Sequence, residues 1–308
     1  MPAIRDVLRR GENVDFAHIA GGDLVGHRTL RQAMIDTLAT IGGARVVAVS
    51  LEELQRSTDP LEVFMLARIV ERDQPGAHAD QVIQAAGSAL QSAARTPAEE
   101  PPDVGPLFDL LCAYRSEQAV ALLEQSAPQW GAYALLALTG LPDGAGIPSM
   151  AALAARPDRE VANRALSFQV LAQTSARYPA AGDALVELAR AGELGDEAWA
   201  ATAEALAGRQ LRFSGRMFDG TPLAEEREAA PAGRSPLWRS YYVEWLNVRY
   251  EDDVVSADWS AEQVARQLAL IDELTELASS PIAVEALQQA RTSLLHARGD
   301  DDGSAAHS

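Results

Sequence analysis

The sequence predicts an all-α protein in which short helices stack one after another as an α-solenoid. From residue 106 onward, helical segments follow each other with turns of a few residues, and no run of alternating β-branched residues predicts a strand. Alanine fills 58 of the 308 positions, and this small, helix-favouring residue lets neighbouring helices approach closely. The chain also aligns with itself at a spacing of about 30 residues, which is typical of stacked helical repeats.

The chain begins with an irregular lead-in, residues 1–28, in which glycines interrupt any sustained helical period. The helical array is expected over residues 29–208. Its first helix follows Thr29, because Thr29 and Gln32 form a capping-box pattern. Asp59 starts a later helix, since aspartate is a good N-cap and the proline after it suits the first helical turn.

A proline-rich and acidic stretch, residues 96–104, indicates a break between two parts of this array. Closely spaced prolines cannot continue a helix, because each lacks a backbone donor and clashes with the preceding turn. The helices expected after the break cover approximately residues 106–114, 116–126, 129–140, 146–155, 158–175, 180–191 and 195–208.

Residues 209–236 interrupt the helical pattern with three glycines and three prolines. The segment is long for a connection inside a compact domain. Three interpretations stay open: an ordered excursion, a disordered loop, or a small hairpin that uses residues 211–213 and 217–218 as its strands.

The remainder is expected to form a C-terminal helical cap, residues 237–298, followed by a disordered tail, residues 299–308. Within the cap, Ser260 and Gln263 form another capping-box pattern, which predicts that a helix begins there. Three of the five tryptophans and three of the six tyrosines fall within residues 238–259. One role for these rings is to cover the open end of the last repeat, and the other is to bind a partner. The predicted partner-binding residues are Trp238, Tyr241, Tyr242 and Trp245.

One segment carries the repeat most clearly. Residues 146–154 contain an Ile-Pro start and spaced apolar residues, Pro157 and Asp158 form a turn, and Val161 opens a second helix. This pattern resembles a HEAT-like repeat of the armadillo type, in which each repeat is a pair of antiparallel helices. The resemblance implies that Asp158 caps the second helix and that Val161 is its first core contact.

Weaker copies lie on both sides of this repeat: Val120 precedes Ile147 by 27 residues, and Leu185 follows it by 38. The resemblance covers residues 105–208, and it extends to residues 29–95 as a general pattern of paired helices. Most members of the family act as scaffolds or bind proteins. The resemblance therefore implies a protein-binding role, although fold alone does not determine function.

The charge pattern excludes several classes of function. The formal net charge is −18, no third of the chain is basic, and all 26 basic residues are arginines. Such a chain repels phosphate backbones, so no nucleic-acid partner is predicted. The absence of lysine excludes Schiff-base chemistry and the lysine-dependent phosphate loop. The predicted partner is a protein or peptide of basic character.

The sequence also bears on location. No apolar run approaches the roughly 20 residues that a membrane helix needs, so no membrane insertion is predicted within the chain. No signal peptide opens the sequence, which predicts a cytoplasmic protein. The alternative is a periplasmic or membrane-anchored envelope protein whose natural start lies upstream of Met1. A disulfide within the chain is excluded, because Cys112 is the single cysteine.

No catalytic residue, metal site or cofactor is predicted. The five histidines include no pair at the helical spacing of metal ligands. The predicted function is therefore a non-enzymatic protein-interaction or scaffold module. The alternative is an enzyme whose carboxylates and arginines meet where residues 209–236 fold over the helices, and its candidate residues are Asp219, Glu251 and Asp253 with Arg212 or Arg216.

Overall fold

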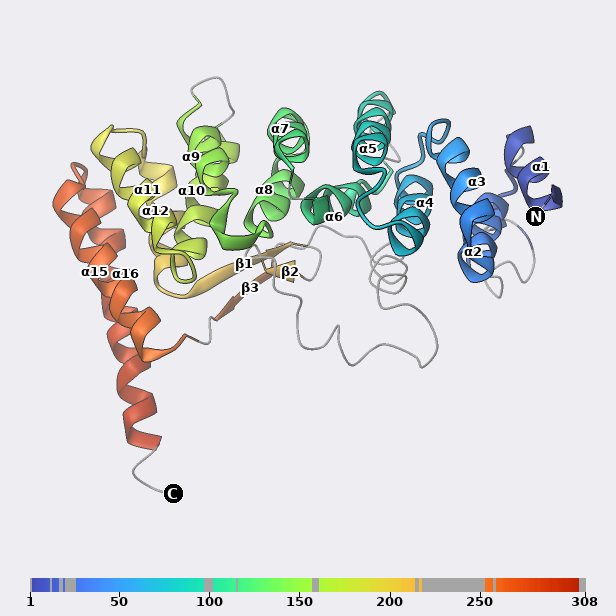
Figure 1. The fold of residues 1–308 in the computed structure, drawn as a ribbon. Coiled ribbons are helices and arrows are strands. Elements are labelled where there is room, and N and C mark those ends of the chain that lie inside the picture. The colour runs from blue at the N-terminus through green and yellow to red at the C-terminus, as the bar shows by residue number, and fades with distance from the viewer. Residues whose placement is uncertain are drawn as a thin grey trace. The chain divides into compact units, whose positions relative to one another are not determined.

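The computed structural model describes residues 2–11, 13–16, 19, 26–96, 102–114, 116–156, 161–213, 216–217, 253–256 and 259–304 (Figure 1). These residues are mainly helical, which confirms the predicted helical character. The chain divides into two compact units, Met1–Leu122 and Leu123–Ser308, and the boundary falls inside helix α7 (Glu117–Ser126). The break expected at residues 96–104 stays a prediction, because residues 97–101 lie outside the described part.

The helices of the first unit that precede α7 are α1 (Pro2–Arg10), α2 (Leu30–Ile41), α3 (Ala44–Leu54), α4 (Pro60–Asp73), α5 (Ala79–Ala93) and α6 (Gly105–Tyr114). The α4 helix is central, since it contacts α2, α3, α5 and α6. It buries Val63, Leu66 and Val70 completely. The short α1 helix contacts α2 and α3 and buries a single residue, Leu8. It corrects the prediction of an irregular lead-in over residues 1–28, because no glycine interrupts residues 2–10.

Two helices of this unit begin where the sequence predicts. The Thr29 hydroxyl accepts a hydrogen bond from the Gln32 backbone N–H at 3.3 Å, and α2 starts at the next residue. The Asp59 carboxylate accepts one from the Glu62 N–H at 2.8 Å and so caps α4. The α2 helix ends at Gly42, whose φ of 66° is a left-handed conformation that glycine adopts without strain.

The helices of the second unit that follow α7 are α8 (Gly131–Thr139), α9 (Ile147–Ala155), α10 (Val161–Ser175), α11 (Pro179–Arg190), α12 (Asp196–Leu206), α15 (Ala261–Leu277) and α16 (Pro281–Ser304). They contact one another in two rows. In the first row α9 contacts α11, which contacts α15. In the second row α8 contacts α10, α10 contacts α12, and α12 contacts α16. The α15 and α16 helices thus continue the two rows. The α16 helix extends to Ser304, into the tail that was predicted to be disordered from residue 299.

Small residues allow this close packing. Ala172 of α10 and Ala205 of α12 are completely buried, and these two helices contact each other along the second row. A Cβ atom on Gly182 of α11 would lie only 3.1 Å from a methyl carbon of Leu270 on α15. The abundance of alanine thus has the structural reason that the sequence suggests, which is close approach between neighbouring helices.

A small sheet lies between α12 and α15 in the chain. Its strands are β1 (Arg209–Phe213), β2 (Arg216–Met217) and β3 (Asp253–Ser256), in the order β2-β1-β3, and both pairings are antiparallel. The β1–β2 pair corresponds to the hairpin among the three interpretations of residues 209–236. The sequence analysis did not predict β3, which lies inside the range assigned to the helical cap. Two adjacent valines favour an extended backbone there.

The C-terminal helices begin at a complete capping box, as predicted. The Ser260 hydroxyl accepts from the Gln263 N–H at 3.3 Å, and the Gln263 side chain accepts from the Ser260 N–H at 2.9 Å. Among the described residues, no helix is both long enough and apolar enough to cross a membrane.

Candidate functional site

The four aromatic residues predicted to bind a partner, Trp238, Tyr241, Tyr242 and Trp245, lie outside the described residues. Asp158, the cap that the family resemblance implies, lies outside them too. Both assignments stay predictions.

The residues of the enzyme alternative are described only in part. Asp219 and Glu251 lie outside the described residues, whereas the backbone of the other three is placed. Arg212 of β1 stands directly opposite Asp253 of β3, and Arg216 of β2 stands opposite Phe213. The fold therefore brings one predicted arginine and one predicted carboxylate to the same rung of the sheet. In the described part of the chain, no group of three or more histidine, cysteine, aspartate or glutamate side chains could hold a metal ion.

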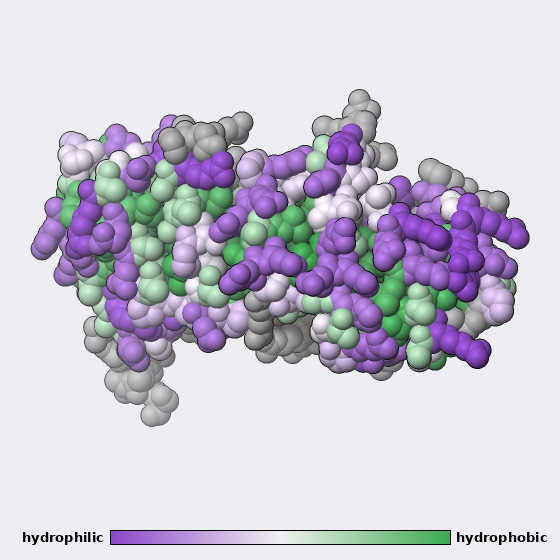
Figure 2. All heavy atoms as spheres, turned by 45° about the horizontal axis from the view of Figure 1, so that its top comes forward, coloured by the Kyte–Doolittle hydropathy of each residue, from purple (hydrophilic) through white to green (hydrophobic). Residues whose placement is uncertain are grey.

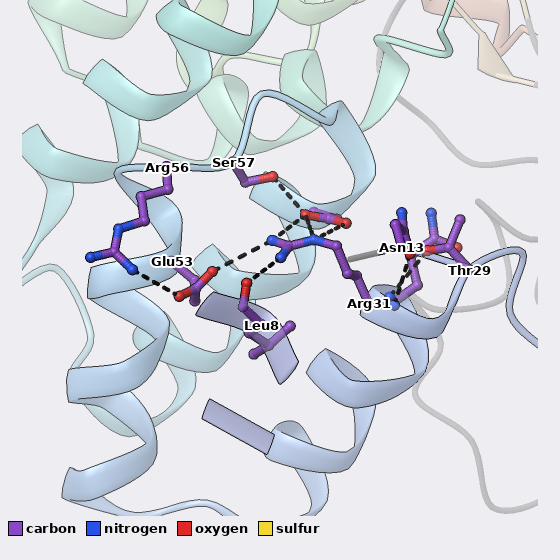
Figure 3. Close-up of polar contacts among 9 residues, drawn as sticks. Leu8, Asn13, Thr29, Arg31, Glu53, Arg56 and Ser57 are labelled. Carbon is purple, nitrogen blue, oxygen red and sulfur yellow. Dashed lines mark hydrogen bonds and ion pairs between the residues drawn. The ribbon is translucent and has the colours of Figure 1, made fainter. Parts of the chain in front are cut away.

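A buried polar cluster lies where α1, α2, α3 and α4 meet (Figure 3). We call it the Arg31 network, and it consists of Arg31, Glu53, Ser57, Glu62 and the backbone carbonyl of Leu8. Arg31 belongs to the first turn of α2, Glu53 to the last turn of α3, and Glu62 to the first turn of α4. Thr29 caps α2 two residues before Arg31, and Asp59 caps α4 three residues before Glu62. The local sequence therefore places these two of the three charged groups.

The Arg31 guanidinium uses all three of its nitrogens. Its Nε donates to the Glu62 carboxylate at 3.0 and 3.2 Å, and its Nη2 donates to Glu62 at 3.0 Å and to Glu53 at 3.5 Å. Its Nη1 donates to the Leu8 carbonyl at 2.6 Å. The Ser57 hydroxyl donates to the Glu62 carboxylate at 2.8 Å. This geometry fixes the guanidinium on two helices, with one nitrogen left to bind α1.

The charged side chains of this network are buried, so their interactions with one another are strong. Glu53 is 1% exposed, Glu62 is 3% exposed and Arg31 is 9% exposed. Burial by itself disfavours the charged guanidinium, but the hydrogen bonds and negative charges of Glu62 and Glu53 outweigh it and raise the pKa of Arg31. Two carboxylates face one guanidinium, and Arg56 reaches Glu53 from the surface at 3.4 Å. Arg31 and Arg56 together therefore balance the charges of Glu53 and Glu62.

The network positions helices rather than catalyses. Ser57 and Glu62 have the residue types of a nucleophile and a base, but the Glu62 carboxylate already accepts hydrogen bonds from both Arg31 and Ser57 and so joins α2 to α4. The sequence analysis missed this network. One sign of it in the sequence is Glu53, a charged residue that directly precedes Leu54 at the end of a mainly apolar helix. Leu54 is buried.

Helix α1 is held on this network and on a neighbouring surface carboxylate. Glu52 of α3 accepts from Arg5 Nε at 3.2 Å and from Arg5 Nη2 at 2.5 Å, and it accepts from Arg9 Nη2 at 3.2 Å. Desolvation works in the opposite direction, but the hydrogen bonds and charges of Arg5 and Arg9 lower the pKa of Glu52. Leu8, between the two arginines on the helix, is 1% exposed. We call the surface that receives α1 the α1 seat, and it consists of Arg31, Glu52 and Glu53.

A second polar contact joins α6 to α4. The Tyr114 hydroxyl donates to the Glu71 carboxylate at 2.7 Å, and the other Glu71 oxygen accepts from the Gly76 N–H at 3.0 Å. Burial and the neighbouring Glu71 charge raise the pKa of Tyr114 well above its ordinary value. The phenol therefore stays protonated and serves as a structural donor.

No family model, curated protein or solved structure matches this chain. The resemblance to HEAT-like repeats accordingly rests on the motifs of the sequence and stays a prediction.

Proposed function

We propose that this chain is a HEAT-like helical-repeat protein that acts as a non-enzymatic protein-interaction module, and that its partner is a protein or peptide of basic character. The observation that carries the proposal is the arrangement of the second unit in two rows of helices. In this arrangement α9 contacts α10, its neighbour in the chain, and each of the two also contacts the next helix of its own row. Stacked helix pairs present long rows of side chains to a partner.

The surface of the second unit supports a basic partner. Asp183 and Glu187 are exposed on α11, and Glu273 and Glu276 are exposed on α15, the next helix of the first row. Arg190 bridges two of these carboxylates, with 2.6 Å to Glu187 and 2.9 Å to Glu273. Four carboxylates against one guanidinium leave an excess of negative charge, which attracts a cationic segment.

The surface also offers apolar contacts. Figure 2 shows one face on which green, hydrophobic residues reach the surface between the purple, hydrophilic ones. Exposed large apolar side chains in the described residues include Ile282 and Leu295, both on α16. Apolar contacts within a charged surround are the usual composition of a protein-binding surface.

The test uses the full-length chain as bait at low salt, followed by purification of each captured protein and calorimetric titration with it. We expect a basic partner whose affinity falls as the salt concentration rises, because screening weakens attraction between exposed charges. Retention of no protein at low salt would contradict the proposal. So would a partner whose binding is independent of salt, since the proposed attraction is electrostatic.

A variant pair tests the predicted aromatic contact with the same partner. We expect alanine at Trp238, Tyr241, Tyr242 and Trp245 to weaken binding strongly, because aromatic side chains contribute disproportionately to protein interfaces. The matched control is Ile41→Ala, which removes an exposed apolar side chain on α2 of the first unit and is expected to leave the affinity unchanged. Equal affinity of the wild-type chain and the aromatic variant would remove these four residues from the binding site.

A further inference from the structure

The α1 seat has the properties of a binding site for a helix, and in this structure it holds a helix of the chain itself. We propose that the seat also accepts a short basic helix from a partner protein, with arginine, leucine and arginine at the spacing Arg-x-x-Leu-Arg. In this structure α1 occupies the seat with Arg5, Leu8 and Arg9 and thereby acts as an intramolecular competitor. The inference rests on the proposed protein-binding function and names one surface that would perform it.

The seat recognises the end of a helix through a donor that is already in place. A helix leaves its last carbonyls without partners inside the helix, and the Leu8 carbonyl in the last turn of α1 is bound by Arg31 Nη1 at 2.6 Å. The other two nitrogens of that guanidinium are held by Glu62 and Glu53. The donor therefore does not depend on α1 for its position, and any helix with a buried leucine at this point could use it.

Charge complementarity selects a basic helix. The Glu52 carboxylate, 37% exposed, accepts hydrogen bonds from both Arg5 and Arg9. Beneath it, Glu53 and Glu62 are balanced by Arg31 and Arg56, so Glu52 supplies the negative charge that the helix meets. The bound helix is rich in arginine, with Arg10 following Arg9. An acidic seat and a basic helix thus meet, with the leucine as the apolar anchor between two arginines.

The contacts of α1 are of a kind that a competitor can replace. The helix has nine residues and buries only Leu8, whereas α4 buries Val63, Leu66, Val70 and five further residues. A helix of this length is not stable by itself in water. Its arginines, 39% and 44% exposed, form ion pairs that water and salt weaken. Displacement of α1 would remove the Leu8 carbonyl from Arg31 but leave the bonds of Arg31 to Glu53 and Glu62 in place.

The experiment uses the full-length chain and a labelled, acetylated and amidated peptide with the sequence of residues 2–11. In the chain, Arg5→Glu with Arg9→Glu places two carboxylates against Glu52 and releases α1 from the seat. We expect the peptide to bind this variant about tenfold more tightly than the wild-type chain, because a tethered α1 competes at a high effective concentration. Fluorescence anisotropy measures both affinities, and circular dichroism checks that both chains are folded.

A charge exchange provides the matched control. Glu52→Arg in an otherwise wild-type chain places an arginine against Arg5 and Arg9, so it too releases α1, and it is expected to abolish binding of the basic peptide. A peptide carrying glutamate in place of Arg5 and Arg9 is expected to regain binding to that chain. Binding that does not change with this exchange of charges would overturn the proposal, because the peptide would then not bind through the contact seen at Glu52.

Two further outcomes would also overturn it. One is a released chain that shows α1 exposed by hydrogen exchange and still fails to bind the peptide. The other is a released chain that binds only through a second copy of itself, seen as a concentration-dependent dimer that the peptide does not dissociate. Failure of the proposed function is distinguishable from both. A chain that binds the peptide with the expected charge dependence but captures no basic partner at low salt contradicts the function and supports the seat.

Discussion

Ser175 and Gln267 lie 92 positions apart in the chain, and their side chains are hydrogen-bonded in the buried contact between α10 and α15 at 2.9 Å. Both are almost completely buried, at 3% and 1% exposure. The bond shows that α15 belongs to the same packed body as α10, although the strands β1, β2 and β3 intervene along the chain.

Gln267→Ala is expected to lower the free energy of unfolding of the second unit by about 1 to 3 kcal/mol, because it removes a buried hydrogen bond and the side chain that fills its place. Urea unfolding followed by circular dichroism measures the change. Gln288→Ala on the exposed side of α16 is the control, and its effect should stay within about 0.5 kcal/mol. Equal effects of the two substitutions would contradict the structural role of Gln267.

Arg31→Met is expected to destabilise the first unit by about 3 to 5 kcal/mol, because it leaves Glu62 buried without a cation and Glu53 with Arg56 alone. Adding Glu53→Gln and Glu62→Gln should recover part of that loss, since neutral amides cost less to bury. Urea unfolding of the single and triple variants measures how much of the lost free energy of unfolding depends on the charges of Glu53 and Glu62. Arg45→Ala, an exposed position on α3, is the control. No recovery in the triple variant would show that charge is not the cause.

Acid is expected to loosen α1 by protonating Glu52. The pKa of Glu52 is lower in the folded chain than in the unfolded chain, so its contribution is fully present above the unfolded value. That contribution is lost as the pH falls below the ordinary glutamate pKa of about 4.3 and through the lower folded value. Backbone amide shifts of α1, followed by NMR from pH 7 downward, report the loosening. In Glu52→Gln the α1 helix should be loosened at every pH, and persistence of the wild-type titration in that variant would assign the effect to another group.

Ser260→Ala is expected to lower the free energy of unfolding by about 1 kcal/mol, because the first turn of α15 loses its capping bond to the Gln263 N–H. Ser260→Asn should retain most of the stability, since asparagine caps equally well. Thermal unfolding of the two variants separates the capping effect from a mere loss of volume. A loss of the same size in both variants would argue against capping.

Replacement of residues 218–252 by a flexible linker is expected to leave the second unit folded. Met217 of β2 and Asp253 of β3 both stand opposite Arg212, on either side of β1. They are therefore separated by two strand spacings, roughly 10 Å, which a linker of about eight glycine and serine residues spans. The expected result is an unchanged helical circular dichroism spectrum and a cooperative unfolding transition. Loss of that transition would show that the packing of α15 on α11 depends on the removed segment.

The starts of three helices could be predicted from the sequence because each depends on a bond between residues three positions apart. Thr29, Asp59 and Ser260 cap their helices as predicted, and the interaction that fixes each start is present in the local sequence. The helical character and the close packing through alanine follow from composition in the same way. The antiparallel pairing of β1 with β2 was one of three open interpretations, since Gly- and Pro-rich segments admit several backbone paths.

The candidate site required the tertiary structure. Arg31, Glu53 and Glu62 resemble surface charges in the sequence, and they become a buried network only because α2, α3 and α4 turn those positions toward one another. Leu8 likewise gives no sign of burial in the sequence, where it is one apolar residue in a basic segment. It is buried in the structure because α1 packs on the α1 seat. Sequence by itself determined where helices begin and what they are made of, because those interactions are local. Tertiary structure decided which charges are buried and which helices meet, because contacts between distant residues depend on the packing of whole helical faces.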